Sequence, residues 1–346
     1  QPVNPVDICQ GGTTTISILA SGGTPSLIYQ WQYDSDPGAG TSWINVANNT
    51  PLGAVYSGNN SSTISVSGIS ESGRYDFRCA ISATGNDCNT IYSDAVTVSV
   101  ISDPVIDVQP TGATICSGSS HNLSVSASGG VGTFSYQWQI STTGTGSWSS
   151  VGANSNSYTT SPTITATRYY HVIVSQTGSG CDTRTSAPAA PVYVSRISNQ
   201  PNSIAICDGG AATLSVTATS GGGTATYTYQ WENGTTAAGP WTAIGGATSN
   251  TYTTATMSGV GNYFYHCVVT SSNPSCTFNS NTATVTVVND PSFTFQSGNQ
   301  DICVGGTANL SVGIIGGTGT ISYQWQSATS CGGLFSDIAG AAASSY

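Results

Sequence analysis

The chain has 346 residues, only 6% of them charged, and its 15 acidic and 5 basic side chains give a net charge of −10. Five scattered arginines cannot form the basic patch that phosphate contacts require, which excludes a nucleic-acid-binding protein. The chain contains no lysine, which excludes a phosphate-loop nucleotide enzyme, and no apolar run approaches the roughly 18 residues of a membrane-spanning helix.

Four consecutive repeats share a series of landmarks. Each repeat has an Ile-Cys step followed closely by glycine, and the tryptophan of a Tyr-Gln-Trp step 22 to 24 residues after that cysteine. The cysteines are Cys9, Cys116, Cys207 and Cys303, and the tryptophans are Trp31, Trp138, Trp231 and Trp325. A fixed order of landmarks at intervals of 93 to 107 residues is the signature of tandem domains.

Within each repeat, apolar and polar residues alternate. Leu123, Val125 and Ala127 alternate with serine, and glycine clusters such as 129–130 and 221–223 separate the alternating runs. A period of two predicts strands, and we expect no helix. Short strands every 8 to 12 residues, in units of about 93 residues, predict all-β sandwiches.

Asp-Pro steps and similar breakers mark the domain boundaries. We expect repeat 1 over residues 1–102, repeat 2 over 103–197, repeat 3 over 198–290 and a partial repeat 4 over 291–346. The linkers are too short to act as flexible tethers, so neighbouring domains are expected to abut and form a rod.

Repeats 1 and 4 are incomplete when aligned with the other two. Gln1 aligns with Gln109, so the first strand of repeat 1 is missing or supplied elsewhere. Tyr346 aligns with Tyr158 and Tyr252, so repeat 4 lacks its last three strands. A half sandwich leaves its inner face and its strand edges uncovered. We expect a longer chain to supply the rest, with completion by another chain as the alternative.

Aromatic residues mark the expected core. The four tryptophans of the Tyr-Gln-Trp steps and a tyrosine of a later strand (Tyr75, Tyr169, Tyr263) are expected to pack inside each repeat. In the same later strand, His171 aligns with Phe77 and Tyr265, which predicts a ring in the core, and Ile173 aligns with Cys79 and Cys267.

A second aromatic follows each of the first three tryptophans by ten to twelve residues, at Trp43, Trp148 and Trp241. Valine or isoleucine follows it at a fixed offset, which favours a packing role. A platform on which sugar rings stack is the alternative.

These landmarks resemble the immunoglobulin superfamily, with Glu71-Ser72-Gly73-Arg74-Tyr75 as the clearest trace. They resemble more closely the tandem immunoglobulin-like and PKD-like repeats of very large Bacteroidota surface proteins, in which Ile115-Cys116-Ser117-Gly118 and Tyr136-Gln137-Trp138-Gln139 have counterparts. The resemblance implies tandem immunoglobulin-like β-sandwiches. It also implies secretion across the outer membrane, often by the type IX system, and a role as an adhesin, filament or stalk.

Ten cysteines in a chain of low charge favour an oxidising, extracellular compartment. The early cysteine (Cys9, Cys116, Cys207) and a cysteine of the last hairpin (Cys88, Cys181, Cys276) are common to repeats 1 to 3. One interpretation is a bridge within each repeat, which pairs Cys9 with Cys88, Cys116 with Cys181 and Cys207 with Cys276. It leaves Cys79 and Cys267 as free buried thiols.

In the topology that the resemblance implies, the early cysteine and the hairpin cysteine lie at opposite poles of one domain. A sandwich strand spans roughly 25 to 30 Å, whereas a disulfide needs Cα atoms within about 7 Å. The second interpretation is therefore a head-to-tail staple, which pairs Cys9 with Cys181 and Cys116 with Cys276. Cys88, Cys207 and Cys303 would then bond to domains outside this segment. A third pairs Cys79 with Cys88 and Cys267 with Cys276, and Cys331 would meet Cys303 or another chain.

No catalytic site is expected. His121, His171 and His266 lie in different repeats, and no Ser–His–Asp, Cys–His or zinc-ligand pattern occurs. Asp34 and Asp36 are weak candidates for calcium ligands, and a solvated turn is the competing interpretation. No other metal and no cofactor is expected.

The sequence thus predicts a non-enzymatic structural segment of an extracellular bacterial surface fibre, stalk or adhesin. Its partners would be neighbouring domains of the same long chain or further copies in a fibre. The alternatives are an array of modules that bind a surface glycan or protein, and accessory domains of a secreted enzyme.

Overall fold

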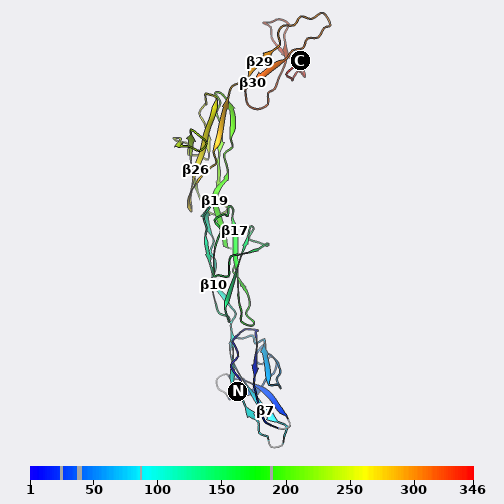
Figure 1. Cartoon of the computed structure of the whole chain (residues 1–346), viewed down its shortest axis with the longest axis vertical. Coiled ribbons are helices and arrows are strands. Elements are labelled where there is room, and N and C mark those ends of the chain that lie inside the picture. Colours follow the sequence, from blue (N-terminus) through cyan, green and yellow to red (C-terminus); the bar gives the residue numbers. More distant parts are fainter. Residues whose placement is uncertain (24–25, 37–40, 86–87, 188–189) are drawn as a thin grey trace. The chain divides into compact units, whose positions relative to one another are not determined.

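In the computed structural model, residues 1–23, 26–36, 41–85, 88–187 and 190–346 are described. These residues form strands, turns and loops, and the described chain contains no helix. The fold is therefore all-β, as the alternating sequence predicts. The chain divides into two compact units, residues 1–193 and 194–346, and the strands are described below by repeat (Figure 1).

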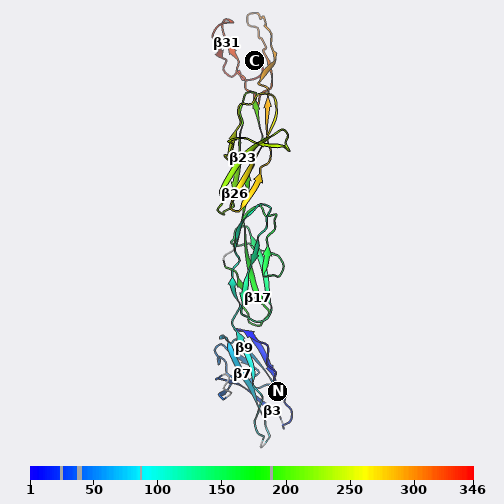
Figure 2. The ribbon, with the colours of Figure 1, turned by 90° about the vertical axis from the view of Figure 1, so that its left-hand side faces the viewer.

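Repeat 1 is a sandwich of two sheets. In the first sheet the strand order is β1-β9-β7-β3-β4, with β8 paired to β7, and Figure 2 shows β3, β7 and β9. The second sheet has the order β2-β6-β5. The strands are β1 (Ile8–Cys9), β2 (Thr13–Ser17), β3 (Leu27–Asp34), β4 (Trp43–Asn45), β5 (Val55–Ser57), β6 (Thr63–Ser67), β7 (Gly73–Ala83), β8 (Ile91–Tyr92) and β9 (Val96–Ile101).

Repeat 2 has the same plan, with the order β11-β19-β17-β14-β15 in the larger sheet and pairs β10-β13 and β12-β16 beside it. The last strand extends beyond the repeat, and its residues 196–199 pair with β22 (Thr217–Thr219). The strands are β10 (Val105–Val108), β11 (Ala113–Cys116), β12 (Asn122–Ser124), β13 (Ser126–Ser128), β14 (Phe134–Ser141), β15 (Ser149–Val151), β16 (Ser157–Thr159), β17 (Arg168–Gln176), β18 (Arg184–Thr185) and β19 (Ala190–Asn199).

Repeat 3 is built in the same way, with the order β20-β28-β26-β23-β24, β27 paired to β26, and the pair β21-β25. The strands are β20 (Ile204–Cys207), β21 (Thr213–Ser215), β22 (Thr217–Thr219), β23 (Tyr227–Gly234), β24 (Trp241–Ala243), β25 (Thr251–Thr253), β26 (Gly261–Ser272), β27 (Ser275–Asn279) and β28 (Ala283–Val288).

Repeat 4 contains two short strand pairs, β29 (Ser292–Gln296) with β30 (Val312–Ile315), and β31 (Gln326–Ser327) with β32 (Ser336–Asp337). The residues equivalent to β20, which include Cys303, form no strand. In repeat 3 β20 pairs in parallel with β28, the last strand, and among the described residues of repeat 4 no such partner strand is present.

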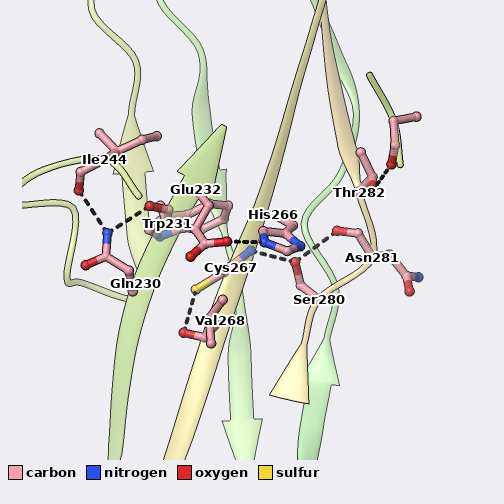
Figure 3. A network of polar contacts seen from close by, with 11 residues as sticks. Gln230, Trp231, Glu232, Ile244, His266, Cys267, Val268, Ser280, Asn281 and Thr282 are labelled. Atoms are coloured by element: carbon pink, nitrogen blue, oxygen red, sulfur yellow. Dashed lines mark hydrogen bonds and ion pairs between the residues drawn. The ribbon is translucent and has the colours of Figure 1, made fainter. Parts of the chain in front are cut away.

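The tryptophans of the first three Tyr-Gln-Trp steps form the centres of the cores, because Trp31, Trp138 and Trp231 are 0% exposed. Each indole Nε1–H donates a hydrogen bond to a backbone carbonyl of the loop beside it, so burial leaves no polar atom unsatisfied. Trp325 of repeat 4 is only half-buried. In repeat 3 the glutamine before the tryptophan links β23 to the residue that follows β24. Gln230 Nε2 donates hydrogen bonds to the carbonyl oxygens of Trp231 and Ile244 (Figure 3).

The register of the long central strands corrects the alignment of repeat 2. Trp31 lies opposite Cys79, Trp231 opposite Cys267, and Trp138 opposite Val172. Val172, and not Ile173, therefore occupies the cysteine position. A serine that bonds to both backbone groups of this residue confirms the register in each repeat: Ser93, Ser186 and Ser280.

The same one-residue shift moves the other predicted core residues of β17. His171 takes the place of Arg78 and His266, on the outer face of the sheet, and the expectation of a core ring there was wrong. Tyr170, which is 0% exposed, fills the core, and Tyr169 is only half-buried. Tyr75 and Tyr263 occupy a common position, where each hydroxyl donates to the carbonyl four residues earlier.

Candidate functional site

The Ile-Cys-x-Gly step forms the same turn in all four repeats. In repeat 1 the Gly12 N–H donates to the Cys9 carbonyl at 3.0 Å, and Gly11 has a φ of +75°. A turn with this hydrogen bond and a positive φ at its third residue requires glycine there. The same turn follows Cys116, Cys207 and Cys303.

A disulfide joins this turn of repeat 1 to the last hairpin of repeat 2. Cys9 and Cys181 are 172 residues apart in sequence, and their Cα atoms are 4.9 Å apart, within the usual range for a disulfide. Two hydrogen bonds reinforce the link. The Cys9 N–H donates to the Ser179 carbonyl at 2.9 Å, and the Thr13 N–H donates to Ser179 Oγ at 2.8 Å. We call these contacts the junction.

The linker between repeats 1 and 2 forms the other side of the junction. Gly130 N–H donates to the carbonyl of Ser102 at 2.9 Å. Arg184 donates through Nε to the Pro104 carbonyl at 3.0 Å, and its guanidinium lies 3.3 Å from the carboxylate of Asp103. Chain path, hydrogen bonds and a covalent bond therefore all restrain repeat 2 relative to repeat 1.

The structure selects among the predicted cysteine pairings for most of the chain. The Cys9–Cys181 bridge is the staple pairing. Cys88, Cys207, Cys303 and Cys331 are free thiols, as are Cys79 and Cys267. This contradicts the pairs Cys9–Cys88, Cys116–Cys181, Cys207–Cys276, Cys79–Cys88, Cys267–Cys276 and Cys303–Cys331. For the pairs of an early and a hairpin cysteine within one repeat, the physical reason is the length of the sandwich strands that separate them. Cys116 and Cys276 are both disulfide-bonded, and their mutual pairing stays a prediction.

The two buried thiols, Cys79 and Cys267, are expected to react slowly. Burial raises the pKa of the Cys79 and Cys267 thiols to about 11 each, so the reactive thiolate is scarce at neutral pH. Both side chains are fully buried in the core. Cys79 lies opposite Trp31 on the neighbouring strand, and Cys267 lies opposite Trp231. Their role is that of small apolar side chains.

On the outer face of the larger sheet, each second tryptophan is covered by a side chain from the central strand. His171 stacks on Trp148 and His266 on Trp241, with ring centroids 3.9 and 4.0 Å apart. In repeat 1 the guanidinium of Arg78 lies 4.4 Å from the Trp43 ring. One face of each tryptophan is therefore occupied, and the packing role and the sugar platform both stay predictions.

A polar partner holds each covering side chain in place. His266 Nε2 lies 2.8 Å from Glu232 Oε2 (Figure 3), His171 Nε2 lies 2.6 Å from Gln139 Oε1, and Arg78 Nε donates to Gln32 Oε1. Sequence reasoning missed this triplet because the aligned histidine was assigned to the core. The signal was present in the Gln or Glu that directly follows the Tyr-Gln-Trp step.

The aspartates proposed for calcium form a turn. Asp34 is fully buried, and its Oδ1 accepts a hydrogen bond from the Asp36 N–H at 3.0 Å. Among the described residues, no group of three or more His, Cys, Asp or Glu side chains gathers as a metal site would require. Residues 37–40, next to this turn, lie outside the described part of the chain.

Two-sheet sandwiches in tandem define the chain as a tandem immunoglobulin-like protein. The family described as "Domain of unknown function (DUF8696)" matches residues 108–195 and 198–289, together just over half of the sequence. The chain belongs to that family. None of the curated proteins compared with the chain matches it. The described residues include no helix long and apolar enough to cross a bilayer.

Several solved structures are similar in fold. A titin I67–I69 variant covers 83% of this chain, with 96% of its own length matched, at 10% identity and a TM-score of 0.39. Drosophila OTK extracellular domains 3–5 cover 83%, with 95% of that chain matched, at 16% identity and a TM-score of 0.26. Three domains of the bacteriophage RB49 outer capsid protein Hoc cover 83%, with 97% matched, at 12% and 0.36. At these scores the matches add nothing to the topology described above.

Proposed function

We propose that this chain is a structural segment of an extracellular bacterial surface fibre, stalk or adhesin. In this proposal, disulfides between neighbouring immunoglobulin-like domains transmit tension along the chain. The observation that carries the proposal is the Cys9–Cys181 bridge, which joins two successive repeats.

The position of the bridge supports a mechanical role. Tension that enters at the N-terminal end reaches Cys9 after eight residues and passes through the sulfur bridge to Cys181. The sandwich strands between these two cysteines then lie outside the path of the force. Between Cys9 and Cys181, the disulfide bears the tension in place of the hydrogen-bonded strands.

Other features support the extracellular setting. Disulfides persist in oxidising compartments outside the cytoplasm, and the junction holds one across two domains. The resemblance to Bacteroidota surface repeats supports a bacterial cell surface and export by the type IX system. Partners would be neighbouring domains of the same long chain or further copies in a fibre.

Single-molecule force spectroscopy of the 346-residue chain, held at its two ends, tests the proposal. Without reductant, we expect the residues between Cys9 and Cys181 to stay out of the stretched length. With reductant, they should add roughly 600 Å of contour length, at about 3.5 Å per residue. A Cys181→Ser variant should release the same length without reductant.

Cys331→Ser is the matched control, because Cys331 is exposed and free and its loss should leave the traces unchanged. Equal extension of the unmodified chain with and without reductant would contradict the proposed transmission of force. So would a Cys181→Ser variant that extends no further than the unmodified chain.

A further inference from the structure

In repeat 1, a positively charged side chain lies between two aromatic rings on the outer face of the larger sheet. The Arg78 guanidinium carbon is 4.4 Å from the centroid of the Trp43 ring and 4.2 Å from that of the Tyr92 ring. Trp43 belongs to β4 and Tyr92 to β8, and these strands lie on opposite sides of the β7–β3 pair. Contacts with both rings hold the guanidinium in one orientation.

The hydrogen-bond donors of this guanidinium are only partly used. Nε donates to Gln32 Oε1 at 2.9 Å, and neither Nη group has a hydrogen bond or ion pair within the described part of the chain. Gln32 is neutral, so it leaves the charge of Arg78 uncompensated. Two free Nη groups present parallel N–H donors, which match the two oxygen atoms of a carboxylate.

The neighbouring aspartate does not neutralise Arg78. Asp76 lies on the same face of β7, but its carboxylate accepts a hydrogen bond from Thr97 Oγ1 at 2.6 Å, and the ion pairs of the described residues do not include Arg78. Arg184, in contrast, lies 3.3 Å from the carboxylate of Asp103. Arg78 therefore keeps an unpaired positive charge on a chain whose net charge is −10.

The second ring and the permanent charge are specific to repeat 1. Tyr92 is 53% exposed, and its equivalents, directly before the serine common to the repeats, are Thr185 and Asn279. The equivalent of Arg78 is a histidine in repeats 2 and 3. Covering the second tryptophan of a repeat thus requires neither an arginine nor a second ring, which leaves both features to be explained by another role.

We propose that Arg78 and Tyr92 form a binding site for a glycan that contains a uronic acid, a sugar whose ring carries a carboxylate. The carboxylate accepts hydrogen bonds from the Nη groups of Arg78, and apolar C–H groups of the sugar pack on the exposed part of the Tyr92 ring. One rigid sugar ring carries both groups, whereas an acidic peptide loses side-chain freedom to make the same contacts. The site adds glycan binding to the structural role proposed above.

Isothermal titration calorimetry of the 346-residue protein with trigalacturonate tests the site. The matched ligand is the trimethyl ester, which keeps the sugar rings but has no charge, and we expect it to bind about tenfold more weakly. Arg78→Lys should weaken binding of trigalacturonate about tenfold, because lysine keeps the charge but lacks the parallel donors. Tyr92→Thr, which introduces the residue of repeat 2, should weaken it about threefold.

Arg74→Lys is the matched control variant, because Arg74 lies on the same face of β7 and donates to Thr97 Oγ1. It should bind trigalacturonate as the unmodified chain does. Far-ultraviolet circular dichroism shows whether each variant is folded, and the comparison of acid and ester uses the unmodified chain alone.

Three outcomes would overturn the proposal. Equal affinity for trigalacturonate and its ester would remove the carboxylate from the recognition. Unchanged affinity in folded Arg78→Lys or Tyr92→Thr would place the binding elsewhere. Equally tight binding of N-acetyl triglutamate amide, an acidic peptide of the same charge, would exclude the sugar as the selected group. The Cys9–Cys181 bridge takes no part in this binding, so the site and the proposed transmission of force can fail separately.

Discussion

Gly12 and Gly180 lie with their backbones in direct contact, one in the turn after Cys9 and the other just before Cys181. A Cβ on Gly180 would overlap the N and Cα atoms of Gly12, and a Cβ on Gly12 would overlap the Ser179 carbonyl. Gly180 also has a φ of +82°, which side chains disfavour. These two glycines allow the close approach that the disulfide requires.

Gly180→Val is therefore expected to prevent the Cys9–Cys181 bridge in most molecules, since the added side chain separates the two backbones. Loss of the bridge should destabilise the pair of repeats by about 2–4 kcal/mol. Non-reducing peptide mapping measures the bridged fraction. Gly245→Ala is the control, because a Cβ there meets no heavy atom within 4 Å. Complete bridging in Gly180→Val would show that the glycine contact is dispensable.

The hydroxyl of Tyr75 offers a test of the corrected register. It donates to the Glu71 carbonyl at 2.9 Å, so Tyr75→Phe should cost about 1 kcal/mol of unfolding free energy. Tyr263→Phe should behave similarly, since its hydroxyl donates to Gly259. Tyr169 holds a different position, so Tyr169→Phe should change stability by less than about 0.5 kcal/mol.

Chemical denaturation of the three variants gives these free energies. If Tyr169→Phe proved as costly as Tyr75→Phe, the one-residue shift in repeat 2 would be wrong. If neither substitution at the shared position had an effect, the hydroxyl bonds would contribute nothing to stability.

The sequence was sufficient to predict the sandwich fold. For Cys9 it left the staple to Cys181 and the bridge to Cys88 as alternatives, and the structure decides for the staple. The sequence was insufficient for β17. The run Arg168-Tyr169-Tyr170-His171-Val172-Ile173 contains adjacent aromatic residues and adjacent β-branched residues, so alternation fits two phases equally well. Only the pairing of Trp138 with Val172 decides between them, and a strand slip of one residue exchanges the two faces of the sheet.

The predicted bridge within each repeat failed for a related reason. Residue types and spacing identify cysteines common to the repeats, but they do not state which domain the partner belongs to. The contact depends on the turn at Gly11 and on the small residues around Ser179, which lie far apart in the sequence. Long-range backbone contacts of this kind carry no periodic signal.

Thiol modification should follow burial. Burial raises the pKa of the Cys79 and Cys267 thiols to about 11, so at pH 8 they should resist alkylation until the domains unfold. Cys88, Cys303 and Cys331 are exposed and should react first, with the half-buried Cys207 slower. Time-resolved alkylation followed by peptide mapping gives the order. Early modification of Cys267 under native conditions would contradict the buried position of its side chain.

A last prediction concerns His171. Burial lowers the pKa of its imidazole below the ordinary value of 6.5. The unfolded chain therefore binds a proton more readily than the folded chain, and stability depends on pH through this difference. The neutral His171 imidazole contributes its full share to the unfolding free energy above pH 6.5. That share is lost as the pH falls below 6.5 and through the lower pKa of the folded chain.

Replacement of the imidazole removes the effect. The difference in unfolding free energy between the unmodified chain and His171→Gln should change between pH 7.5 and pH 5, with the unmodified chain losing more stability on acidification. Glutamine keeps a polar group near Gln139 but does not titrate. Measurement at constant ionic strength limits the contribution of the 15 acidic residues, which both proteins share. Parallel pH profiles for the two proteins would show that His171 takes up its proton equally well in the folded and unfolded chains.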